Sequence, residues 1–85
     1  MSVRVTKNGS TEPPQCAIIV SKKVAKTAVA RNTLRRKIYG ALIPIIGTLP
    51  EGYRFFFYPK QATLKLSGNR LSQAVNELVK KTNLI

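Results

Sequence analysis

Hydrophobic and polar positions alternate at the start of the chain, where Val3 and Val5 stand between polar residues. A period of two is typical of a strand with one buried face, so we predict a short strand over residues 2–7. The next apolar run, Cys16 to Val20, is nearly continuous and rich in β-branched residues. It predicts a second strand that is buried on both faces. We expect the two strands to pair as a hairpin.

From residue 28 the period changes to that of a helix. Thr27 is a plausible N-cap, and the spacing predicts a helix from Ala28 to about Ile43, which Pro44 kinks or ends. The apolar residues that share one face of this helix are Leu34, Ile38, Ala41, Leu42 and Ile45. That face is expected to pack on the sheet.

Tyr53 to Tyr58 forms the strongest strand pattern in the sequence, and a final helix is predicted after Ser67. The apolar stripe of that helix comprises Leu71, Val75, Leu78 and Val79. The order β-β-α-β-α predicts an α+β fold, a small two-layer sandwich with the helices against the sheet. We expect one domain over residues 1–85, since nothing marks a second one.

The strand at 53–58 carries aromatic residues on both of its faces. Alternation places Tyr53, Phe55 and Phe57 on one face and Arg54, Phe56 and Tyr58 on the other. One face must pack under the helices, so at most one is free to stack nucleic-acid bases. Most aromatic residues in such a strand are core residues.

The charge of the chain is one-sided, with 15 Lys and Arg against 3 acidic residues, a formal net charge of +12 and a pI of about 10.6. No acid interrupts the segment from Ser21 to Ile38. Its candidate binding residues are Lys22, Lys23, Lys26, Arg31, Asn32, Arg35, Arg36 and Lys37. The first turn of a helix also offers free N–H groups to phosphate. Together these features predict a nucleic acid as the partner.

Alternative interpretations of these residues stay open at this point. The lysines are a solvated loop if they meet no phosphate. Arg31 lies nearest the apolar stripe, where a guanidinium can stack over the core instead, and Asn32 can bond a nearby backbone group.

The side-chain inventory argues against catalysis by the protein itself. The chain has no His and no Asp, and its acids are Glu12, Glu51 and Glu77. We therefore expect no catalytic residue, no metal site and no cofactor on this chain. Its single cysteine, the lack of a signal-peptide pattern and the short apolar runs favour a cytoplasmic protein that does not enter a membrane.

The basic segment resembles the signature of the bacterial ribonuclease P protein subunit. The residues that carry the resemblance are Val20-Ser21-Lys22-Lys23-Val24, followed by Ala28-Val29-Ala30-Arg31-Asn32-Thr33-Leu34-Arg35-Arg36-Lys37-Ile38. The similarity extends over roughly residues 16 to 81. Two positions depart from the family pattern, because Thr33 and Tyr39 stand where basic residues are usual.

The resemblance implies a fold of the ribosomal protein S5 domain 2-like class, with a left-handed βαβ crossover instead of the usual right-handed form. It also implies a short form of the family, since the helix that the family places before its first strand has no counterpart here. In the family that helix walls one side of a cleft for the 5′ leader of precursor tRNA.

The resemblance further implies a role as the protein subunit of ribonuclease P, an endoribonuclease that removes the 5′ leader of precursor tRNA. The RNA subunit is the catalyst and uses Mg²⁺, and one protein is expected per RNA. Possible leader contacts are Phe55, Phe57 and Lys60.

Two other functions share most of these features. A ribosomal protein, or another small basic RNA-binding module with no role in tRNA processing, fits the composition equally well. A DNA-binding protein that places the basic helix in a major groove is the third, although no dimer element is recognisable.

Overall fold

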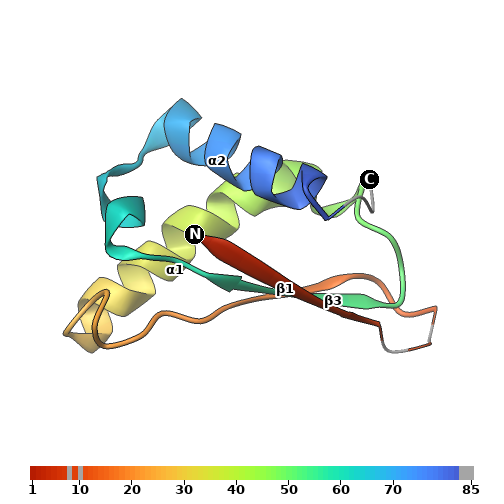
Figure 1. Cartoon of the computed structure of the whole chain (residues 1–85), viewed down its shortest axis with the longest axis horizontal. Coiled ribbons are helices and arrows are strands. Elements are labelled where there is room, and N and C mark those ends of the chain that lie inside the picture. Colours follow the sequence, from red (N-terminus) through yellow and green to blue (C-terminus); the bar gives the residue numbers. More distant parts are fainter. Residues whose placement is uncertain (8, 10, 83–85) are drawn as a thin grey trace.

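The computed structural model describes residues 1–7, 9 and 11–82. Its elements follow the order β1 (Ser2–Lys7), β2 (Gln15–Ile18), α1 (Ala28–Ile46), β3 (Tyr53–Tyr58), the 3₁₀-helix η1 (Gln61–Lys65) and α2 (Gly68–Lys80). The predicted α+β fold with a β-β-α-β-α order is confirmed, with η1 added between β3 and α2. Figure 1 shows α1 and α2 crossing above the strands.

β3 occupies the centre of the sheet, whose strand order is β1-β3-β2. β1 pairs with β3 antiparallel, and β2 pairs with β3 in parallel. The expected hairpin between the first two strands is therefore wrong. β3 takes the central place because Phe55 and Phe57, its two most buried side chains, are then flanked by a strand on each side.

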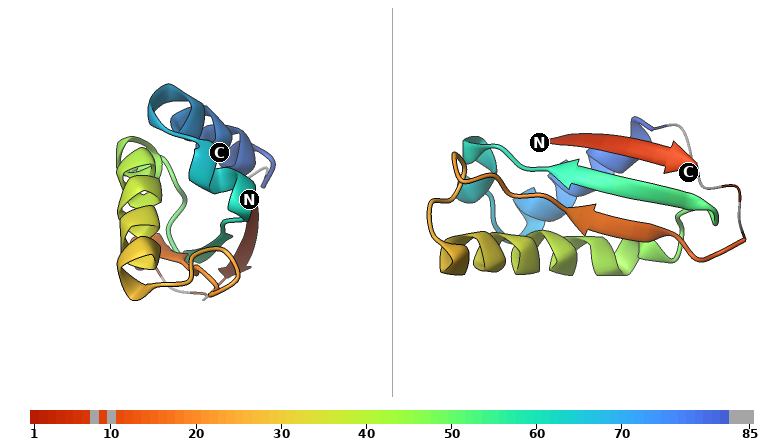
Figure 2. Two further views of the ribbon diagram at one scale, coloured as in Figure 1. Left: turned by 90° about the vertical axis from the view of Figure 1, so that its left-hand side faces the viewer. Right: turned by 90° about the horizontal axis from the view of Figure 1, so that it is seen from below.

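The parallel pair β2 and β3 is joined through α1, which makes a βαβ crossover. Seen with the helices behind the sheet and both strands pointing up, β3 lies to the right of β2 (Figure 2), so the crossover is left-handed. This is the uncommon hand.

Both helices cover the same face of the sheet, and the opposite face is open (Figure 2). β2 is consequently half-buried at Cys16 and Ile18 but exposed at Gln15 and Ala17. The expectation that this strand is buried on both faces is wrong, since its apolar run reflects one covered face and one edge.

The core lies between the sheet and the helices. Its fully buried side chains are Phe55, Phe57, Ile38, Leu42, Val75 and Val79. α1 contacts β2 and α2, while α2 also contacts β1. The two helices thus cover different parts of the same face of the sheet, and each contributes its predicted apolar stripe.

α1 begins as predicted, because the Thr27 hydroxyl accepts a hydrogen bond from the Ala30 amide at 3.1 Å. The helix continues through Pro44 to Ile46, three residues past the predicted end at Ile43. Pro44 lacks an N–H, so it removes a single helical bond, and half-buried apolar side chains hold the last turn. Among the described residues, no helix combines the length and apolar character that crossing a membrane requires.

Candidate nucleic-acid interface

The loop between β2 and α1 is folded by its own hydrogen bonds. The amides of Val24 and Ala25 both donate to the Ser21 carbonyl at 3.1 Å, and Ala25 is buried. The three lysines of the loop are Lys22, Lys23 and Lys26, and all of them are exposed. The loop is therefore anchored on the core side and presents its cations outward.

Arg31 fastens this loop to the first turn of α1. Its Nη1 donates to the carbonyl oxygens of Ala25 at 3.1 Å and Lys26 at 3.2 Å. The side chain is half-buried, as expected at the margin of the apolar stripe. Arg31 thus has a structural task, and the guanidinium keeps further N–H donors beyond those two bonds.

Asn32 and Arg35 form a side-chain pair on the next turn of α1. Arg35 Nη1 donates to Asn32 Oδ1 at 2.6 Å, and Arg35 Nε donates to the Ile18 carbonyl of β2 at 3.4 Å. The Asn32 side chain therefore bonds another side chain, and not a nearby backbone group as one interpretation of the sequence allowed. The two bonds hold the Arg35 guanidinium between the helix and the edge of the sheet.

Arg36 and Lys37 lie further round the same helix. Both are exposed, and neither side chain hydrogen-bonds or pairs with any residue that the structure describes. Their charges face solvent, where they are available to neutralise phosphate.

η1 adds cations from a distant part of the sequence. Gln61 Nε2 donates to the Lys23 carbonyl at 3.0 Å, so η1 lies against the Ser21–Lys26 loop at the start of α1 (Figure 2). Lys60 and Lys65 are exposed on this segment. We call these five exposed lysines the basic end: Lys22, Lys23 and Lys26 of the loop, Lys60 at the N-cap of η1, and Lys65 in η1. Sequence reasoning missed Lys65, because no local pattern joins it to a loop some 40 positions earlier.

Phe55 and Phe57 are excluded as leader contacts, because both side chains are 0% exposed in the core. The reason is the alternation of the strand: the helices cover the face that carries these two rings. The open face of β3 carries Arg54, Phe56 and Tyr58 instead, of which Arg54 is exposed and the two rings are half-buried.

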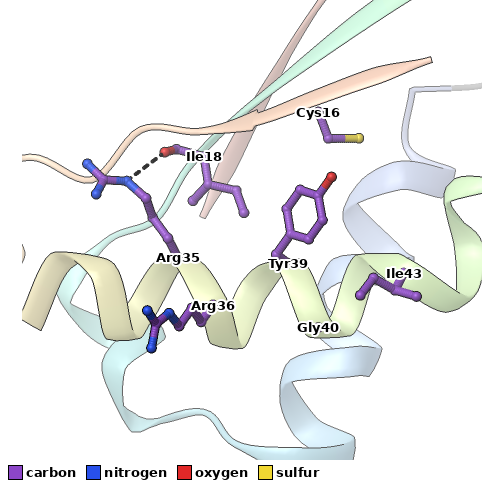
Figure 3. Close-up of a pocket in the computed structure, with 7 residues that line it drawn as sticks. All are labelled: Cys16, Ile18, Arg35, Arg36, Tyr39, Gly40 and Ile43. Carbon is purple, nitrogen blue, oxygen red and sulfur yellow. Dashed lines mark hydrogen bonds between the residues drawn. The ribbon is translucent and has the colours of Figure 1, made fainter. Parts of the chain in front are cut away.

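A groove of about 390 Å³ runs between α1 and β2, beside Arg35 and Arg36 (Figure 3). Cys16 and Ile18 line it from the strand, and Tyr39 stands on the helix side. Burial raises the pKa of the Cys16 thiol, because a thiolate there would lose contact with water. Sequence reasoning did not identify this groove, since it depends on how the helix lies against the strand.

Comparison with known proteins shows which family the chain resembles. The family model "Ribonuclease P" matches residues 1–83. Two curated proteins named ribonuclease P protein component, from Synechococcus sp. strains JA-2-3B'a(2-13) and JA-3-3Ab, are each 36% identical over 73 residues, which is 86% of this chain. The solved structure of the ribonuclease P protein from Thermotoga maritima superposes with a TM-score of 0.72 at 21% identity, covering 98% of this chain and 74% of that one.

The likeness to the Thermotoga structure concerns the fold. The chain spans 55% and 58% of the lengths of the two Synechococcus proteins, so little more than half of each relative is represented. The family match itself covers nearly the whole chain. On this basis the chain belongs to the ribonuclease P protein family.

Proposed function

We propose that this chain binds the RNA subunit of ribonuclease P and assists it in removing the 5′ leader from precursor tRNA. The observation that carries the proposal is the set of exposed cations on the basic end and on the outer side of α1. It is supported by membership of the family and by the net charge of +12.

The contacts of this surface suit the recognition of a folded RNA. Arg31 and Arg35 are held by hydrogen bonds to backbone carbonyls, so part of the surface is ordered before RNA arrives. Arg36 and Lys37 keep all of their donors available to solvent. An ordered surface loses less side-chain entropy on binding than a set of mobile lysines would.

We assign the chemistry to the RNA subunit. Three glutamates with no histidine or aspartate leave few side chains for a general base or a metal-ligand set, which supports catalysis by the RNA with its own Mg²⁺. In this proposal the protein neutralises phosphate charge, one protein serves one RNA, and the work takes place in the cytoplasm.

The open face of the sheet is the candidate surface for the single-stranded leader. Phe56 and Tyr58 are half-buried there, with Arg54 on the same strand and Arg4 paired opposite Phe56 on β1. Aromatic rings flanked by cations bind single strands by stacking and charge together. Lys60 follows at the end of β3, where the open face meets the basic end.

Reconstitution with the cognate RNA subunit tests the function. Cleavage of precursor tRNA at low magnesium is measured with and without the protein, and we expect the protein to raise the rate. Absence of stimulation, together with tight binding to ribosomal RNA, would assign the chain to the alternative class of basic RNA-binding modules.

A further inference from the structure

The Arg35 side chain lies at the free edge of the sheet. β2 is an edge strand, and the Ile19 N–H donates to the Phe57 carbonyl of β3 at 2.9 Å. Because the N–H and the C=O of a trans peptide unit point in opposite directions, the Ile18 carbonyl points away from β3. Arg35 Nε donates to this carbonyl at 3.4 Å (Figure 3). Arg35 therefore ties α1 to the edge of the sheet.

Asn32 supplies the stronger of the two bonds that hold Arg35. Its Oδ1 accepts from Arg35 Nη1 at 2.6 Å, which is shorter than a typical N–H···O bond, whereas the bond to Ile18 lies at the outer limit of the usual range. A guanidinium has donors only, so the oxygen of the Asn32 amide must face it. Its charge strengthens the bond further. Without Asn32, the guanidinium would keep only the weaker contact with Ile18.

The held guanidinium keeps donors for an anion. Neither bond uses Arg35 Nη2, and no residue that the structure describes bonds this group. The neighbouring Arg36 is exposed, and its side chain points away from the strand (Figure 3). Of these two arginines, Arg35 alone presents its donors in a direction that the protein sets.

Asn32 can contribute to RNA binding in two ways. Its Nδ2 group can donate to the RNA directly, or its Oδ1 can act through Arg35. The second way is favoured because Oδ1 already has a short bond to the guanidinium. A side chain that is ordered before binding also loses less entropy when its partner arrives.

We propose that Asn32 is a positioning residue, which holds the Arg35 guanidinium at the edge of β2 so that Nη2 meets an RNA phosphate. This inference rests on the proposed function, because it assigns separate tasks to two residues of the RNA interface. Arg35 contacts the RNA, and Asn32 contributes through Arg35.

Nuclear magnetic resonance of the free protein tests the positioning without RNA. The ¹H–¹⁵N heteronuclear NOE of the Arg35 Nε–H group reports its order on the ps–ns timescale. We expect an ordered signal in the wild type, its loss in Asn32→Ala and its recovery in Asn32→Asp, which keeps an acceptor oxygen but has no Nδ2 donors. Thr33→Ala is the matched control and should keep the signal, since the Thr33 hydroxyl bonds the Val29 carbonyl within α1. An ordered Arg35 in Asn32→Ala would overturn the inference.

Binding to the cognate ribonuclease P RNA tests the consequence in a double-mutant cycle. Asn32→Ala should raise Kd about 3- to 10-fold, the cost of ordering one long side chain on binding. The slope of log Kd against log salt should stay as in the wild type, because no cation is lost. In an Arg35→Met background, which keeps an unbranched stem but removes every donor, Asn32→Ala should change Kd by less than about twofold.

Thermal melting followed by circular dichroism first establishes which variants fold, and the measurement on Asn32→Ala alone decides the positioning if the double variant does not. An equal rise of Kd in both backgrounds would overturn the inference, assign Asn32 to direct RNA contact and leave the proposed function intact. Failure of the wild type to bind the RNA at all would overturn both proposals.

Discussion

Gln61 Nε2 donates a hydrogen bond to the Lys23 carbonyl at 3.0 Å and thereby joins two segments that are 38 positions apart. The contact holds the backbone of the Ser21–Lys26 loop at Lys23, whose side chain is part of the basic end. η1 is held in place by the same bond. The basic end therefore behaves as one unit and not as two independent loops.

Replacing Gln61 by Ala should loosen this unit. We expect the free energy of unfolding to fall by about 0.5–1.5 kcal/mol, the net value of a single hydrogen bond, and the Kd for the RNA subunit to rise. Urea denaturation and filter binding measure the two effects. Gln73→Ala, at an exposed glutamine of α2, is the matched control and should change neither.

Arg31→Ala should be more damaging to the fold than any other substitution of an arginine on α1. The guanidinium donates to two carbonyls, and hydrogen bonds from charged groups contribute about 1.5–3 kcal/mol. Because Arg31 is only half-buried, we expect a loss of stability near the lower end of this range. Arg31→Lys should recover only part of the loss, because an ammonium does not have the planar fork of donors. Equal stability of Arg31→Ala and wild type in urea would assign Arg31 to RNA contact alone.

Arg36→Ala should weaken RNA binding without affecting the fold. If five to seven cations meet phosphates, log affinity falls with log salt by about 0.7–0.9 per contact, and removing one cation lowers the slope by about one. Arg35→Ala should also lower the slope by about one, but with a loss of stability, since it bonds the edge of β2. Lys80→Ala, in the last turn of α2, is the control. If Lys80→Ala changed the slope of log affinity against log salt as much as Arg36→Ala does, Arg36 would have no specific place in the RNA interface.

Two neighbouring phenylalanines of β3 should give opposite results. Phe57→Ala empties a fully buried site and should cost about 3–5 kcal/mol of stability. Phe56→Ala, on the open face, should leave the protein folded and lower the affinity of the reconstituted enzyme for precursor tRNA by about 1–3 kcal/mol per lost stacked base. Leaderless tRNA is the comparison substrate: the loss should vanish with it, and a loss of equal size would remove the leader from the open face.

Cys16 should make the fold less stable in alkali. Its pKa in the folded chain is raised above the ordinary value of 9.0, so the unfolded chain loses the thiol proton first. The protonated Cys16 thiol makes its full contribution to the free energy of unfolding below pH 9.0. This contribution declines as the pH rises from there through the pKa of the folded state. Urea denaturation between about pH 7 and 11, roughly two units either side of the ordinary value of 9.0, is compared with Cys16→Ala, which removes the thiol but leaves the other titrating groups. A difference between the two proteins that does not vary with pH would contradict the assignment.

The helices were predictable from local pattern, and the strand pairing was not. Leu34, Ile38 and Leu42 recur at helical spacing, and all three are buried as that spacing requires. Strand order depends instead on which strand has the most apolar surface to cover. The local pattern describes each strand by itself and does not compare one strand with another. The hairpin between β1 and β2 was expected because strands that are neighbours in sequence often pair, whereas here β3 lies between them.

The same division applies to the candidate site. The helical period placed Arg31 and Arg35 at the margin of the apolar stripe and Arg36 outside it, and their exposure agrees. Strand alternation predicted that at most one face of the 53–58 strand is free, but it did not say which face. The contact of Gln61 with the lysine loop and the groove beside Tyr39 arise from tertiary packing, for which no local signal exists.

The central position of β3 has a consequence for synthesis of the chain on the ribosome. Neither β1 nor β2 has a strand to pair with until Tyr53–Tyr58 has left the exit tunnel, so the sheet cannot assemble before that segment emerges. Contacts between segments so far apart in sequence slow folding. Assembly of the sheet therefore waits for β3, and until then the lysine loop and the arginines of α1 emerge on a cationic chain whose sheet has not formed.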